Sequence, residues 1–143
     1  MSSWVCVDAS FVVRLVTGGP HAEEIADLWL SWQRDAVRVA APGLLRYEVT
    51  NALRWYAAHG EITAEEAAEM LDTALALGIE LRHEETLHRR ALEIAARYEL
   101  PVAYDAHTVA LAERLGASLW TTDARLARRL SGDAERVRLI GAG

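Results

Sequence analysis

The sequence predicts an α/β fold, a three-layer sandwich with a mostly parallel central sheet. Two observations carry this prediction: short apolar runs alternate with longer amphipathic stretches, and the apolar runs are nearly continuous. Strands that are buried on both faces have this pattern, and right-handed crossovers then place helices on both faces of the sheet. Because we find no linker, internal repeat or low-complexity tract, residues 1–143 are expected to form a single domain.

In the first half of the chain, local signals mark where helices begin and end. Pro20 and Pro42 suit first helical turns, and Gly60 and Gly78 suit C-terminal caps. Residues 63–66 form a capping box. The predicted strands are residues 4–7 and 37–40, and the predicted helices are residues 9–15, 21–34, 42–59 and 63–77.

In the second half, the same alternation continues with shorter connections. Apolar runs predict strands, and the amphipathic stretches between them predict helices. The predicted strands are residues 79–82, 101–104 and 118–121, with an edge strand at 137–140. The predicted helices are residues 84–98, 106–115 and 124–130.

Composition narrows the class of protein. The net charge of −6 argues against a protein that coats nucleic acid without specificity, although it leaves room for a local basic strip. Cys6 is the only cysteine, so an intrachain disulfide is impossible and a reducing cytoplasm fits. No apolar run reaches the roughly 18 to 20 residues that a membrane helix needs. We expect a cytoplasmic protein with no membrane contact.

Three aspartates share one context, in which an apolar strand ends and a helix begins. They are Asp8, Asp105 and Asp123, each followed by Ala. In a parallel sheet the carboxyl ends of all strands lie at one edge, which is where ligands bind, so these residues can converge there. Asp is also a favoured helix N-cap, and for each residue alone this alternative stays open. Capping does not exclude metal binding, since a carboxylate has two oxygens.

Glu48 lies at the border of the apolar stripe of its predicted helix, near Leu45 and Ala52. A carboxylate drawn into a core needs a partner, because an isolated buried charge is too costly. The partner could be an Arg, or Glu48 could simply lie at the edge of solvent. Asn51 lies one turn further along, where it could orient Glu48 or contact a substrate.

If the four carboxylates meet, protonation or cations must relieve their repulsion. Hard divalent ions are the natural cations at neutral pH. An all-oxygen site suits Mg²⁺ or Mn²⁺ and not Zn²⁺, since no Cys or His pair has ligand spacing here. Such a metal can activate water against a phosphodiester. The carboxylate pattern therefore favours phosphodiester hydrolysis without a covalent intermediate.

Four segments in register resemble the four motifs of PIN-domain proteins, with the greatest similarity to VapC-like toxins of prokaryotic toxin–antitoxin pairs. The similarity runs nearly end to end and in order. The segments are residues 7–10, 47–53, 104–106 with 110–112, and 121–126.

This resemblance implies a Mg²⁺- or Mn²⁺-dependent endoribonuclease that cuts cellular RNA and arrests growth. It also implies a homodimer and a cognate antitoxin that covers the active site. The family's acidic quartet, which is catalytic and binds the metal, matches Asp8, Glu48, Asp105 and Asp123. Supporting polar positions match Ser10, Asn51 and Thr122, although both hydroxyls can equally serve local turns or caps.

Several other residues have two interpretations. Four arginines could guide RNA phosphates to the metal or could form solvated helix faces: Arg14, Arg125, Arg128 and Arg129. A single histidine such as His107 is more typical of a helix surface or of packing than of catalysis.

Four other functions compete with the toxin. Phospho-accepting receiver domains and haloacid-dehalogenase-type phosphatases also carry acidic residues at strand ends, but both depend on a Lys. All 15 basic residues here are Arg, and a planar guanidinium replaces an ammonium poorly. A non-toxin PIN nuclease of RNA processing, or an inactive PIN-fold binding module, remains open.

Overall fold

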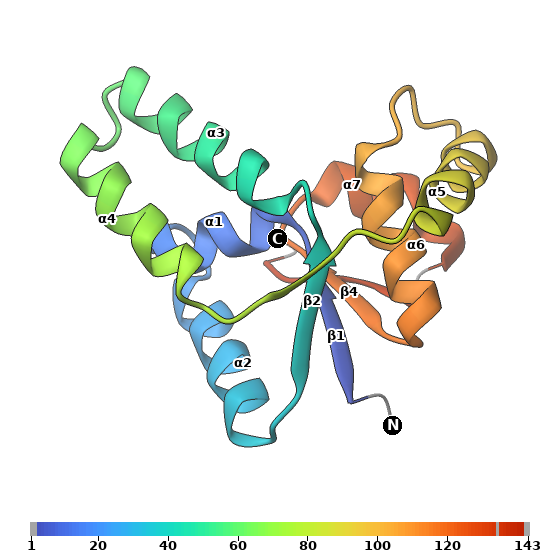
Figure 1. Cartoon of the computed structure of the whole chain (residues 1–143). Helices are drawn as coiled ribbons and strands as arrows, with labels where there is room; N and C mark the ends of the chain where they lie inside the picture. The colour runs from blue at the N-terminus through green and yellow to red at the C-terminus, as the bar shows by residue number, and fades with distance from the viewer. Residues whose placement is uncertain (1–2, 134, 142–143) are drawn as a thin grey trace.

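The computed structural model describes residues 3–133 and 135–141, and it confirms the three-layer α/β fold (Figure 1). Five parallel strands form one sheet in the order β3-β2-β1-β4-β5. The strands are β1 (Trp4–Val7), β2 (Arg38–Pro42), β3 (Glu80–Arg82), β4 (Ser118–Thr121) and β5 (Val137–Leu139). The helices are α1 (Ala9–Thr17), α2 (Ala22–Arg34), α3 (Leu45–Ala58), α4 (Ala64–Leu75), α5 (Thr86–Arg97), α6 (Tyr104–Leu115) and α7 (Ala124–Arg129), and a 3₁₀ turn follows at Ser131–Asp133.

The sheet separates two apolar cores. Helices α1 to α4 cover one face, where Phe11 and Trp32 stack with ring centroids 5.4 Å apart. Helices α5 to α7 cover the other face (Figure 1). Adjacent residues of β1 divide between the two cores, Cys6 on one side and Val7 on the other, both fully buried. This double burial explains the continuous apolar strands.

Local signals place several helix ends correctly. The capping box is confirmed: the Thr63 hydroxyl accepts from the Glu66 amide at 3.0 Å, and the Glu66 carboxylate accepts from the Thr63 amide at 2.9 Å. Pro42, predicted to open a helix, is instead the last residue of β2, and α3 begins at Leu45. Proline here ends a strand because that position does not require its missing N–H.

The strand predicted at residues 101–104 is wrong. Residues 101–103 form a bend, and Tyr104 is the first residue of α6. Val102 and Tyr104 are 56% and 61% exposed, so this apolar run does not contribute to the core. The place beside β1 is taken by β4, leaving no position for an additional strand between them.

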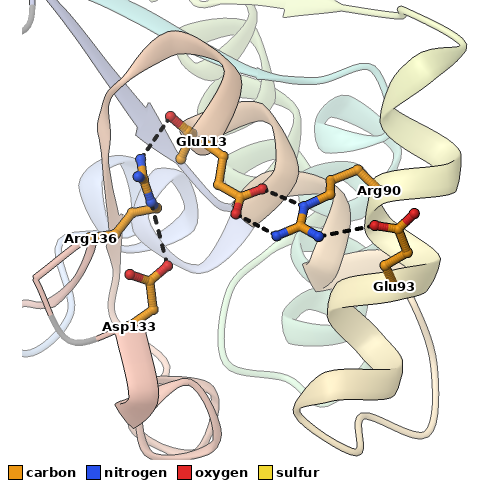
Figure 2. A network of polar contacts seen from close by, with 6 residues as sticks. Arg90, Glu93, Glu113, Asp133 and Arg136 are labelled. Carbon is orange, nitrogen blue, oxygen red and sulfur yellow. Dashed lines mark hydrogen bonds and ion pairs between the residues drawn. The ribbon is translucent and has the colours of Figure 1, made fainter.

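Polar contacts fix α5 against α6 (Figure 2). Arg90 of α5 donates to both carboxylate oxygens of Glu113 on α6, at 2.7 and 2.8 Å, and to Glu93 at 3.0 Å. Arg136 pairs with Asp133 and donates to the carbonyl of Ala112. This network connects α5, α6 and the segment before β5, away from the sheet's carboxyl edge.

The strand order places a topological switch point between β1 and β4. From β1 the chain proceeds outward to β2 and β3, and then returns to β4 on the other side of β1. The crossovers diverge at the carboxyl ends of these two strands, which is where open parallel sheets bind ligands. Asp8 follows β1 directly, and Asp123 follows β4. Within the described residues, no helix is long and apolar enough to cross a membrane.

Candidate active site

Asp8 is a buried carboxylate that caps α1. Its Oδ1 accepts from the Phe11 amide at 3.0 Å and from the Ser10 hydroxyl at 2.6 Å. Its Oδ2 accepts from the hydroxyl of Thr121, the last residue of β4. Asp8 is 8% exposed. The capping interpretation is therefore correct, and the same side chain is also held at the switch point by a hydrogen bond across the sheet.

Thr121 and Ser10 connect the ends of β1 and β4. The Thr121 hydroxyl, fully buried, also accepts from the Asp123 amide at 3.0 Å, and it lies 3.2 Å from the Ser10 hydroxyl. The sequence interpretation assigned the supporting hydroxyl to Thr122, but only the Thr122 backbone amide takes part, donating to Ser10 at 3.0 Å. Thr121 was missed, although its alternation with buried Leu119 places it on a buried face.

Asp123 and Asp105 are held in different ways. Asp123 is the N-cap of α7, and its Oδ1 accepts from the amides of Arg125 and Leu126 at 3.0 and 3.1 Å. Asp105 was expected after a strand, as a cap; instead it is the second residue of α6, whose N-cap Ala103 makes no side-chain hydrogen bond. Asp105 is therefore not the N-cap of α6, although its charge in the first turn is favourable to the helix dipole.

Glu48 projects from the first turn of α3 and is half-buried. The pKa of its carboxyl is raised from 4.5 to about 7, first by burial and then by the charges of Asp105 and Asp8. Within residues 3–133 and 135–141, Glu48 has no hydrogen bond and no ion pair. The salt bridge considered from the sequence is absent there.

The charges of the carboxylates raise pKa values within the group. Burial raises the pKa of Asp8 from 3.8 to about 6, with a contribution from the charge of Asp105, while hydrogen bonds from Ser10, Thr121 and the Phe11 amide oppose the rise. The pKa of Asp105 is also raised, first by burial and then by the charge of Asp123. These mutual effects place the four acidic side chains in one electrostatic cluster, as the sheet-edge argument predicted.

In the described part of the chain, no arginine forms an ion pair with this cluster. Among the described residues, the ion pairs do not include Asp8, Glu48, Asp105 or Asp123. Three carboxyls with raised pKa values, one buried and two half-buried, therefore have no ion-pair partner among the residues that the structure describes. Such an arrangement is relieved by a proton or by a bound cation.

Two pockets border the cluster. One, of about 190 Å³, is lined by Asp105 and Asp123 together with Arg125 and Arg129. The other, of about 450 Å³, has Glu48 in its wall.

The remaining predicted site residues lie outside these two pockets. Asn51 is exposed in a neighbouring pocket and makes no hydrogen bond to Glu48. Arg14 lies in a separate pocket with Tyr56 and donates to the Pro20 carbonyl at 3.4 Å. Arg128 is exposed and lines neither of the two pockets that border the carboxylates.

The donor set is compatible with a hard divalent cation. Over the part of the chain that the structure describes, no three His, Cys, Asp or Glu side chains form a group that could hold a metal ion by themselves. Mg²⁺ usually keeps several waters and takes one or two carboxylates together with substrate phosphates. The uncompensated carboxylate oxygens fit that mode of binding.

Comparison with known proteins agrees with this geometry. The family model described as PIN domain matches residues 5–130. The fold is similar to the crystal structure of PAE2754 from Pyrobaculum aerophilum, with a TM-score of 0.65, 26% sequence identity, and coverage of 88% of this chain and 86% of that one. No curated protein sequence matches. A parallel sheet with acidic residues at its switch point and a family match over most of the chain lead to one conclusion: the chain belongs to the PIN domain family, a fold that is generally that of a metal-dependent nuclease.

Proposed function

We propose that the protein is an endoribonuclease that hydrolyses RNA phosphodiester bonds with Mg²⁺ or Mn²⁺. The observation that carries the proposal is the cluster of carboxyls at the switch point, one buried and the others half-buried. Charges within the cluster raise the pKa values of Asp8, Glu48 and Asp105, and no ion pair neutralises them among the described residues. An uncompensated cluster costs folding free energy, so its persistence in a ligand-binding position favours a functional role.

Asp8, Glu48, Asp105 and Asp123 are the residues that would hold the metal, directly or through water. When bound, the metal supplies a water of lowered pKa and stabilises charge on phosphate oxygens. Asp8 is well suited as a fixed ligand because two hydroxyls and one amide orient it. Oδ1 accepts two hydrogen bonds, whereas Oδ2 accepts only the one from Thr121 and keeps a lone pair available for a metal.

Two arginines of the chain are placed where they can bind a phosphate of the RNA. Arg125 and Arg129 line the pocket that contains Asp105 and Asp123, so they can bind phosphate oxygens beside the acidic cluster. Arg14 and Arg128 would contact RNA only beyond this pocket. The general base need not be a histidine, since a carboxylate with a raised pKa, such as Glu48, can take the proton of the attacking water.

In the cell, we assign the protein to a toxin–antitoxin pair, as the cytoplasmic toxin. The similarity of its four motifs to those of VapC-like toxins supports this assignment. A homodimer and an antitoxin that covers the acidic cluster follow from the same similarity. An antitoxin with a basic side chain at the cluster would neutralise the carboxylates, which have no ion-pair partner within residues 3–133 and 135–141.

Cleavage of single-stranded RNA by the purified protein tests the nuclease. Asp8→Asn and Asp105→Asn should each abolish cleavage while the circular dichroism spectrum stays unchanged. Asp72→Asn, at an exposed position of α4, should cleave like the wild type. Excess EDTA should stop the reaction, and Mg²⁺ or Mn²⁺ should restore it. Full activity in EDTA, or in either site variant, would refute the metal nuclease.

Induction in a bacterial host tests the toxin. The wild type should arrest growth, and Asp8→Asn should not. Co-expression of the product of a small overlapping upstream reading frame should restore growth. Normal growth with an active nuclease would assign the protein to RNA processing instead.

A further inference from the structure

The larger pocket beside the acidic cluster has a composition that the nuclease site does not explain. It lies between the start of α3, the segment after β3, and helices α5 and α6, and it measures about 450 Å³. Its polar and aromatic lining includes Tyr47, Glu48, His83, His88, Tyr104 and His107. Glu48 therefore belongs both to this pocket and to the acidic cluster.

Two exposed tyrosines border this pocket. Tyr47 is 75% exposed and Tyr104 is 61% exposed, so neither ring is needed for the core. Each comes directly before an acidic residue of the cluster, Tyr47 before Glu48 on α3 and Tyr104 before Asp105 on α6. Successive residues of a helix point about 100° apart, so the rings lie beside the carboxylates and not among them. They are positioned to contact a group attached to whatever binds at the cluster.

Three of the five histidines of the chain also line this pocket. His107 Nδ1 donates to the Ala103 carbonyl at 2.7 Å, so in neutral His107 the Nε2 atom is an acceptor. His88 Nδ1 lies 2.9 Å from that atom and must donate to it, which leaves His88 Nε2 as an acceptor. The His83 ring lies against Gly43, where an added Cβ would be 2.2 Å from Cε1. The pocket thus combines flat rings with an oriented hydrogen-bond acceptor.

We infer that this pocket binds a nucleobase of single-stranded RNA, adjacent to the phosphate held at the acidic cluster. The inference rests on the proposed nuclease function. Aromatic faces stack with any base, and single-stranded RNA is recognised in this way through its unstacked bases. The volume lies in the range of pockets that enclose small ligands.

Continuity with the cluster favours RNA over a protein partner. A nucleotide carries its base and its phosphate on one sugar. Here Tyr104 lines the aromatic pocket, and the next residue, Asp105, lines the pocket with the two arginines that are proposed to bind the phosphate. His88 Nε2 can accept a hydrogen bond from a base amine, and the tyrosine rings supply stacking surfaces. A protein partner would also use exposed tyrosines, so the experiment includes that outcome.

The test measures binding, independently of cleavage. Fluorescence anisotropy in EDTA gives the Kd for a labelled single-stranded RNA and for a matched oligomer of abasic ribose phosphates. Tyr47→Ala and Tyr104→Ala should each weaken binding of the intact RNA about 5- to 150-fold, the range for loss of one base–aromatic stack. Tyr104→Phe should bind like the wild type. Trp55→Ala, which removes an exposed ring of α3 outside the pocket, is the control and should bind normally.

The abasic oligomer separates base stacking from other effects. The wild type and both alanine variants should bind it with equal, weak affinity. Unchanged binding of intact RNA by both alanine variants would overturn the inference, as would equal losses for intact and abasic RNA. No measurable binding of RNA by the wild type would also overturn it. Loss of self-association in the variants, with RNA binding intact, would assign the tyrosines to a protein interface and reject the base pocket.

The outcomes also separate this inference from the nuclease proposal. Tyrosine-dependent binding of the base without metal-dependent cleavage would refute the nuclease and keep the pocket. Metal-dependent cleavage that Asp105→Asn abolishes, together with normal binding by both alanine variants, would refute the pocket alone.

Discussion

Replacing Glu48 by Gln should stabilise the metal-free protein at alkaline pH. The pKa of this carboxyl rises from 4.5 to about 7 on folding, so between these values the folded state holds more protons than the unfolded state. The stability of the folded state therefore falls as pH rises through this window, and the full deficit is present above it. A neutral glutamine of nearly the same shape removes the deficit.

The magnitude follows from the size of the shift. A rise from 4.5 to about 7 corresponds at most to about 3 kcal/mol of lost stability. Because the side chain is only half-buried, solvent screening reduces this to about 1 to 2 kcal/mol. For a chain of 143 residues that gain corresponds to a rise in Tm of about 3 to 6 °C.

Thermal unfolding followed by circular dichroism in EDTA checks this expectation. Glu48→Gln should melt above the wild type at about pH 8, and most of the difference should disappear at about pH 5. Glu65→Gln, at an exposed position of α4, is the matched control and should show no pH-dependent gain. Added Mg²⁺ should raise the Tm of the wild type more than that of the variant. An equal Tm at the higher pH, or the same gain at both pH values, would refute the electrostatic reasoning.

Two further variants test the supports of the site and of the fold. Thr121→Val removes a buried donor to Asp8 and the acceptor of the Asp123 amide, so urea unfolding should show a loss of about 1 to 3 kcal/mol and RNA cleavage should fall. The Thr122 hydroxyl makes no hydrogen bond within the described residues, so Thr122→Val should change neither stability nor cleavage. Equal losses in the two valine variants would contradict the role given to Thr121. Arg90→Ala should cost about 1 kcal/mol or less because its ion pairs are partly exposed, with a smaller loss in high salt. The Arg90→Ala variant should cleave RNA normally. A loss of stability that does not depend on salt would show that Arg90 stabilises the fold by packing and not by its ion pairs.

Local chemistry explains why much of the site could be predicted. Asp8 and Asp123 directly follow apolar runs and precede helices, and both the strand ends and the caps are visible in the sequence. Glu48 stood out because a charge interrupts the border of an apolar stripe. The capping box at Thr63 follows from spacing alone.

The sequence pattern predicted the correct edge of the sheet for Asp105, but partly for a wrong reason. The run at residues 101–104 has the composition of a strand, but those residues form a bend and the first residue of α6. The composition of a segment shows only that it could form a strand. Whether it does so depends on whether a neighbouring strand is free to pair with it, and β1 already pairs with β4 on that side.

From the sequence alone we could predict the alternation of strands and helices, the carboxyl ends of β1 and β4, and the acidic residues that follow them. These features depend on neighbours along the chain. The tertiary structure decided that Thr121 and not Thr122 holds Asp8, that Glu48 has no cation among the described residues, and that His88 meets His107. Each of these joins elements remote in sequence, and their distances are set by how helices pack on the sheet. For the acidic cluster, this packing brings the carboxylates into mutual repulsion, whereas the sequence could say only that they would face the same edge.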